Sequence, residues 1–93
     1  MSLKQEVPQI IIDEIIAEVA RAQAKFPDWP TDIIHAAAIV GEESGELTQA
    51  ALQWTYESGK LSEAKKEAVQ VACTAIRFLI GLGNFHYESN PTM

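Results

Sequence analysis

Three blocks of the chain place apolar residues at the three- and four-residue spacing of an amphipathic helix. The first block extends from about Pro8 to Lys25. Its apolar positions are Ile11, Ile12, Ile15, Ile16, Val19 and Ala20, and its polar positions are Asp13, Glu14, Glu18 and Arg21. Proline is well tolerated in the first turn of a helix, where its missing N–H would have no partner. The pattern therefore predicts a helix with an isoleucine-rich side.

The second helix is bounded by strong start and stop signals. Two prolines in "FPDWP" (26–30) cannot lie inside one helix, so the first helix ends there. Thr31 or Asp32 then provides an N-cap side chain. The helical pattern continues to about Glu57, where Ser58-Gly59 provides a stop.

The third helix is predicted from a cap at Ser62 to about Leu82, and short connections favour antiparallel neighbours. Residues 1–7 and 84–93 are expected to be loop or tail, with aromatic side chains of the tail folding back. Residues 1–93 are too few for more than one domain. The expected fold is all-α, a single antiparallel bundle of three main helices.

Charge and hydropathy exclude two classes of partner. The formal net charge of −6 is unsuited to a nucleic-acid backbone, which requires a basic surface. It is compatible with small phosphorylated ligands, because carboxylates reach phosphates through Mg²⁺. No stretch has the roughly 18 uninterrupted apolar residues of a membrane span, and the N-terminus has no signal-peptide layout.

Cysteine content and chain length indicate the setting of the protein. Cys73 is the only cysteine, so no disulfide forms within one chain, and its apolar helical context predicts a buried thiol. A reducing, cytoplasmic location is expected. A chain of 93 residues buries only a modest core, so we expect a homo-oligomer to cover the remaining apolar faces.

Three glutamates interrupt the apolar run of the second helix. Its stripe consists of Ala36, Val40, Glu43, Leu47, Ala50 and Trp54. Glu46 projects beside Glu43, and Glu42 lies about 100° around the helix. Like charges gathered in this way cost stability unless a cation neutralises them.

The third helix carries Glu67 and Gln70, again three residues apart. If the two helices pack antiparallel, these side chains converge with Glu43 and Glu46 into a cage of oxygen ligands. Hard cations such as Mg²⁺ or Mn²⁺ prefer such oxygen sites. The alternative is a solvated acidic patch, with the second helix rotated so that its carboxylates face water.

The two glutamate motifs resemble those of the MazG-like, all-α nucleoside triphosphate pyrophosphohydrolases. That family carries EExxE on one helix and ExxD on the next. The segment "EESGE" (42–46) matches the first motif, and "EAVQ" (67–70) matches the second except at Gln70. The resemblance extends from about Trp29 to Leu82.

The resemblance implies that Glu43, Glu46 and Glu67 are Mg²⁺ ligands, with Gln70 a neutral, weaker ligand in place of the family aspartate. Glu42 is implied to be a further ligand or the residue that orients the attacking water, which makes Glu42 and Glu43 the catalytic pair. The reaction implied is hydrolysis of an NTP or dNTP to the monophosphate and pyrophosphate. Family members are dimers or tetramers, with the site near the subunit interface.

Four further residues are candidate substrate contacts. Trp29 and His35 offer a flat wall or an edge for a base, and Lys60 and Arg77 offer positive charge for phosphates. Each basic residue has the alternative of an ordinary surface charge, and Trp54 is expected in the core or at a subunit interface. Because Gln70 departs from the family pattern, two other functions stay open. One is a nucleotide or metal binder with weakened catalysis, and the other is a non-enzymatic helical oligomerisation or partner-binding protein.

Overall fold

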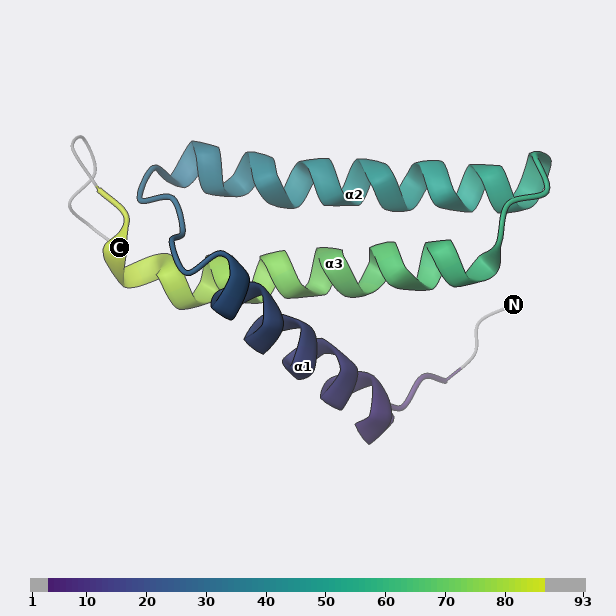
Figure 1. Ribbon diagram of the computed structural model, residues 1–93, viewed down its shortest axis with the longest axis horizontal. Coiled ribbons are helices and arrows are strands. Elements are labelled where there is room, and N and C mark those ends of the chain that lie inside the picture. Colours follow the sequence, from purple (N-terminus) through teal and green to yellow (C-terminus); the bar gives the residue numbers. More distant parts are fainter. Residues whose placement is uncertain (1–3, 87–93) are drawn as a thin grey trace.

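The computed structural model describes residues 4–86, which form three α-helices followed by one short 3₁₀ helix. The helices are α1 (Gln9–Lys25), α2 (Ile33–Tyr56), α3 (Leu61–Ile80) and η1 (Gly81–Asn84). No strand occurs in this part of the chain, so the all-α prediction with three main helices is confirmed. Helices α2 and α3 lie side by side and antiparallel, and α1 crosses α3 obliquely (Figure 1).

The helix ends follow the sequence signals at one junction and depart from them at another. The carboxylate of Asp32 accepts hydrogen bonds from the backbone N–H groups of Ile34 (2.8 Å) and His35 (3.2 Å), as expected of a cap. The predicted cap at Ser62 is wrong, because α3 already begins at Leu61 and Lys60 occupies the N-cap position without a side-chain bond.

The connection between α2 and α3 is tight, which explains the early start of α3. Ser58 adopts a positive φ of 59°, and the N–H of Gly59 donates to the Gln53 carbonyl at 2.8 Å. A Cβ at Gly59 would lie 2.9 Å from the Gln53 backbone, so this close approach requires glycine. The chain has therefore already reversed when it arrives at Lys60.

Helix α1 packs on α3, and its backbone does not come close to that of α2. Its buried residues are Val19 and Glu18. The assignment of Glu18 to the polar side of the helix is therefore wrong, since the line of contact with α3 passes through it. Most isoleucines of α1 are nevertheless uncovered: Ile10, Ile11, Ile12 and Ile16 are 66, 47, 38 and 56% exposed, whereas Ile15 is half-buried.

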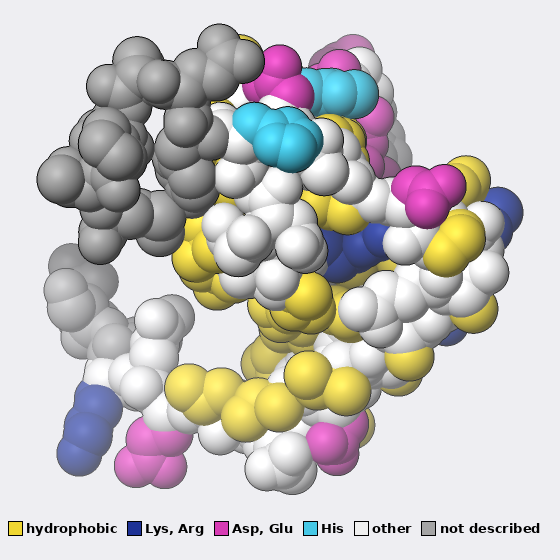
Figure 2. Space-filling view, turned by 90° about the vertical axis from the view of Figure 1, so that its left-hand side faces the viewer, with side chains coloured by type: hydrophobic (Ala, Val, Ile, Leu, Met, Phe, Trp, Pro, Cys, Tyr) yellow, Lys and Arg dark blue, Asp and Glu magenta, His cyan; other side chains and the backbone are white. Residues whose placement is uncertain are grey.

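The buried apolar core of the described chain is small. It consists of Val19, Ala36, Ala50, Cys73 and Phe85. Phe85 follows η1 and packs back onto Phe78, with ring centroids 5.1 Å apart. Trp54 is 52% exposed, so it is not a core residue of this chain. Hydrophobic side chains lie uncovered across the face in Figure 2.

Two further expectations concern the ends of the chain and the membrane. The tail predicted from residue 84 begins with the last residue of η1, and residues 1–3 and 87–93 lie outside the described part. None of the described helices combines the length and apolar character needed to cross a membrane.

Candidate metal centre

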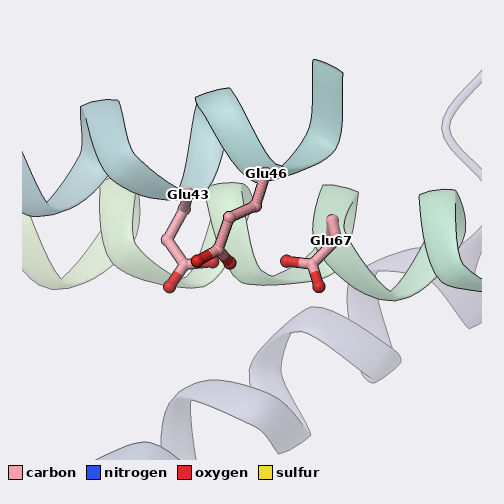
Figure 3. A group of neighbouring side chains, drawn as sticks. All are labelled: Glu43, Glu46 and Glu67. Carbon is pink, nitrogen blue, oxygen red and sulfur yellow. The ribbon is translucent and has the colours of Figure 1, made fainter. Parts of the chain in front are cut away.

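Three carboxylates from two helices meet near the middle of the α2–α3 pair. Glu43 and Glu46 lie on α2 and Glu67 on α3, and each offers an oxygen within 4.8 Å of the oxygens of the other two. The three side chains point toward one another (Figure 3). The antiparallel packing therefore brings together three of the four predicted ligands, on the pattern expected from their spacing.

The local charge and burial disfavour three free carboxylates. Glu43 is partly buried, and its Oε2 is inaccessible to solvent without a hydrogen-bond partner. Burial raises the pKa of Glu43 above its ordinary value of 4.5, and the charges of Glu46 and Glu67 raise it further. Burial likewise raises the pKa of Glu67, with a further contribution from Glu46. A buried carboxylate oxygen that lacks a hydrogen-bond donor lies here beside two further carboxylates. Such a group of oxygen atoms suits a hard divalent cation as its ligands.

These shifts predict a pH dependence of stability in metal-free buffer. Because the folded-state pKa values of Glu43 and Glu67 lie above those of the unfolded chain, the folded protein binds protons more tightly. Their contribution to stability is present below pH 4.5 and is lost as pH rises through the raised values. We therefore expect the Tm of Glu43→Gln to rise relative to the Tm of wild type as the pH increases over this range. A difference that stays constant with pH would contradict the shift.

A cavity of about 460 Å³ adjoins Glu43. Its walls come from α1, the 26–30 loop, α2 and α3, and they include Gln70, Cys73 and Arg77. Glu46 and Glu67 line a neighbouring hollow of about 390 Å³. The carboxylate cluster thus borders two cavities, and the larger one is of the size that holds small-molecule ligands.

Arg77 lies inside this wall, so its alternative as an ordinary surface charge is wrong. It is 8% exposed, and its guanidinium donates to the backbone carbonyls of Phe26 (2.5 Å) and Asp28 (3.4 Å). The guanidinium carbon also lies 4.9 Å from the centre of the Trp29 ring. Arg77 therefore holds the 26–30 loop to α3, and it covers one face of the indole that was predicted to contact a base.

The other predicted substrate contacts are spread along the molecule. His35 is exposed at the start of α2, and Lys60 is exposed at the opposite end of the helical pair, roughly 25 Å along α3 from Arg77. Neither lines the 460 Å³ cavity. Glu42 is exposed beside the cluster, and its charge contributes to the raised pKa of Glu43. Of the four predicted substrate contacts, the structure therefore brings only Trp29 and Arg77 together.

Gln70 faces α1 through its amide nitrogen. This nitrogen donates to Oε2 of Glu18 at 2.7 Å, and the other carboxylate oxygen of Glu18 pairs with Arg21. The role of the Gln70 oxygen as a fourth ligand stays a prediction. Glu18, Arg21 and Lys25 all line the cavity, and sequence reasoning missed Glu18 and Arg21 as site residues. The available signal was Glu18 itself, a carboxylate three residues after Ile15 and four before Ala22 on an otherwise apolar line.

Cys73 matches its prediction as a buried thiol, at 1% exposure. Burial raises the pKa of the Cys73 thiol, which keeps it protonated and unreactive at neutral pH.

Comparisons with family models, with curated proteins and with solved structures found no match to this chain.

Proposed function

We propose that this protein is a Mg²⁺-dependent nucleotide pyrophosphohydrolase, which hydrolyses an NTP or dNTP to the monophosphate and pyrophosphate. The observation that carries the proposal is the convergence of Glu43, Glu46 and Glu67, with oxygens within 4.8 Å of one another, beside a cavity of about 460 Å³. The three glutamates also belong to the two sequence motifs that resemble those of MazG-like enzymes, and this resemblance supports the same assignment.

The residues present fit a hard divalent cation. Three carboxylates from two rigid helices supply oxygen ligands, and the buried Oε2 of Glu43 lacks any other partner. A bound Mg²⁺ would neutralise phosphate oxygens and act as a Lewis acid at the α-phosphate. Mn²⁺ has similar ligand preferences and is expected to replace it.

The remaining chemistry belongs to side chains of the chain. We assign to Glu42, which is exposed and whose charge acts on Glu43, the role of orienting the attacking water and accepting its proton. The water oxygen forms a bond to the α-phosphorus, and the bond from that phosphorus to the bridging oxygen breaks. The leaving pyrophosphate takes the electron pair of that bond. The cavity wall around Arg77 and Trp29 receives the rest of the nucleotide.

A screen of nucleotides tests the proposed activity. The purified chain is incubated with a panel of NTPs and dNTPs in Mg²⁺ or Mn²⁺, and release of pyrophosphate is measured. We expect at least one nucleotide to be converted to its monophosphate. If no nucleotide turns over but thermal shift shows Mg²⁺-dependent nucleotide binding, the protein is a binder. If neither occurs, the oligomerisation or partner-binding alternative is favoured.

We further propose that the active form is a homodimer or homotetramer, acting in the cytoplasm. The small core and the exposed isoleucines of α1 support this proposal. Exposed apolar side chains along one helix are typical of a face that packs against a partner helix. A second copy of this chain would supply such a face with the same composition.

Ile16→Glu is expected to weaken this association by tenfold or more. Ile16 is 56% exposed, and burying an isoleucine side chain against a partner is worth about 1.5–3 kcal/mol. Sedimentation velocity over a concentration series measures the shift toward monomer. Ala24→Glu adds the same charge on the same helix without removing a large apolar side chain, so its effect is expected to be smaller. A monomeric wild type at all concentrations would contradict the oligomer.

A further inference from the structure

The cavity beside the carboxylate cluster has a cationic wall that comes from α1. Arg21 and Lys25 lie four residues apart on this helix, so their side chains share one face, and both line the cavity together with Glu43. Arg21 has 69% of its side chain exposed, and Lys25 is also exposed. Both charges are therefore accessible to a ligand that enters from solvent.

A buried hydrogen-bond pair fixes this part of α1 against α3. The Glu18 side chain is 11% exposed and accepts from the Gln70 amide at 2.7 Å. The same carboxylate pairs with Arg21, three residues further along α1. Gln70 on α3 is thus hydrogen-bonded to the turn of α1 that precedes Arg21 and Lys25.

The charges of the cavity suit an anion only when a cation is present. Its lining contains three basic side chains and three carboxylates, namely Arg21, Lys25, Arg77, Glu18, Asp28 and Glu43. These charges cancel, so a divalent cation held at Glu43 would leave the cavity positive. Arg77 is buried and already bonded to two backbone carbonyls. Arg21 is paired with Glu18, and the Lys25 ammonium lies 5.4 Å from the centre of the Phe26 ring, yet both remain exposed to solvent and can reach a ligand.

We propose that Arg21 and Lys25 bind the phosphate chain of the nucleotide, and that Gln70 is the positioning residue that holds them there through Glu18. This inference depends on the proposed function, because it assigns the triphosphate part of the same substrate. Polyphosphate is the ligand class that matches two accessible cations one helical turn apart beside a metal site.

The Glu18 carboxylate also gives a physical reason for glutamine at position 70. An aspartate there would place a second carboxylate beside the buried Glu18 and would offer no hydrogen-bond donor to it. An amide can donate to Glu18, so the departure from the family motif is explained by the carboxylate on α1.

Calorimetry with inorganic tripolyphosphate tests the phosphate contacts without reference to any base. The full chain is titrated with tripolyphosphate in Mg²⁺. We expect Arg21→Gln/Lys25→Gln to bind at least about tenfold more weakly than wild type. Lys25→Gln alone is expected to weaken binding about threefold or more, and it serves as the variant that leaves the Glu18 network intact. Lys4→Gln is the matched control, and it should bind like wild type.

The outcomes separate this inference from the proposed function. Unchanged tripolyphosphate affinity in both Lys25→Gln and the double variant overturns the inference, whereas the proposed function is judged by pyrophosphate release from the nucleotide panel. A wild-type chain that releases pyrophosphate but does not bind tripolyphosphate would likewise overturn the inference alone.

The positioning role of Gln70 is tested by removing its hydrogen bond to Glu18 and then by exchanging the two side chains. Gln70→Leu removes no charge, yet it is expected to weaken tripolyphosphate binding at least threefold because the Glu18 turn of α1 loses its hydrogen bond to α3. Glu18→Gln/Gln70→Glu restores the hydrogen bond in the opposite direction and should return the affinity to within about twofold of wild type. If Gln70→Leu binds like wild type, or if the exchange does not rescue binding, the positioning role is wrong.

Discussion

Glu43→Gln is expected to reduce Mg²⁺-dependent nucleotide hydrolysis by at least about 100-fold while making the metal-free protein more stable. Mutation of a residue that hydrogen-bonds to a metal ligand typically costs about 10- to 100-fold in metal affinity or activity, so loss of a ligand itself should cost more. Stability should rise because the substitution removes the charge that Glu46 and Glu67 oppose. Like charges one helical turn apart cost about 0.5 kcal/mol, which corresponds to roughly 2–4 °C in Tm.

The two effects together distinguish a metal ligand from a structural residue. Turnover is measured as pyrophosphate release, and stability as Tm in buffer with a chelator and in buffer with Mg²⁺. Wild type should gain Tm from Mg²⁺, whereas the variant should not. Glu6→Gln removes the same charge from an exposed position before α1 and is the matched control. Loss of activity accompanied by lower metal-free stability would show that Glu43 serves the fold.

Arg77→Met is expected to destabilise the protein by about 2–3 kcal/mol. The substitution leaves the carbonyls of Phe26 and Asp28 without their donor and removes the cation over the Trp29 ring. Hydrogen bonds to charged groups contribute about 1.5–3 kcal/mol each, and water that enters the cavity would recover part of this. Methionine preserves most of the buried aliphatic volume, so the loss would measure the polar contacts and the contact with Trp29.

Tryptophan fluorescence localises this effect to the 26–30 loop. In a Trp54→Phe background Trp29 is the only tryptophan of the chain. Its emission should shift to the red in Arg77→Met before global unfolding, because the loop is no longer held to α3. Arg77→Lys keeps the charge but lacks the planar fork, so an intermediate loss is expected. A change in unfolding free energy below about 0.5 kcal/mol in Arg77→Met would contradict the anchoring role.

Local features of the fold were predictable because they depend on spacing within one segment. The 3.6-residue periodicity identified all three helices, and the two candidate caps, Thr31 and Asp32, identified the start of α2, where Asp32 is the residue that caps. The cluster of Glu43, Glu46 and Glu67 was also predictable. Residue spacing places the first two on one face, and a short connection requires α3 to return antiparallel beside them.

The rotation and crossing of α1 could not be predicted, because they depend on contacts between distant segments. Periodicity assigned Glu18 to a polar face, yet its hydrogen bond to Gln70 spans 52 residues. The same kind of contact buries Arg77, whose partners on the 26–30 loop precede it by about 50 residues. The residue pattern within one helix contains no information about contacts between distant segments. The position of Arg21 and Lys25 in the cavity wall is therefore known only from the structure.

Pyrophosphate release by the purified chain, with and without a chelator, tests the central claim most directly. The three-carboxylate site predicts that at least one NTP or dNTP is hydrolysed to its monophosphate and pyrophosphate in Mg²⁺. It also predicts that EDTA abolishes the reaction and that added Mg²⁺ restores it. Absence of pyrophosphate from every nucleotide in both Mg²⁺ and Mn²⁺, or release that continues unchanged in EDTA, would contradict it.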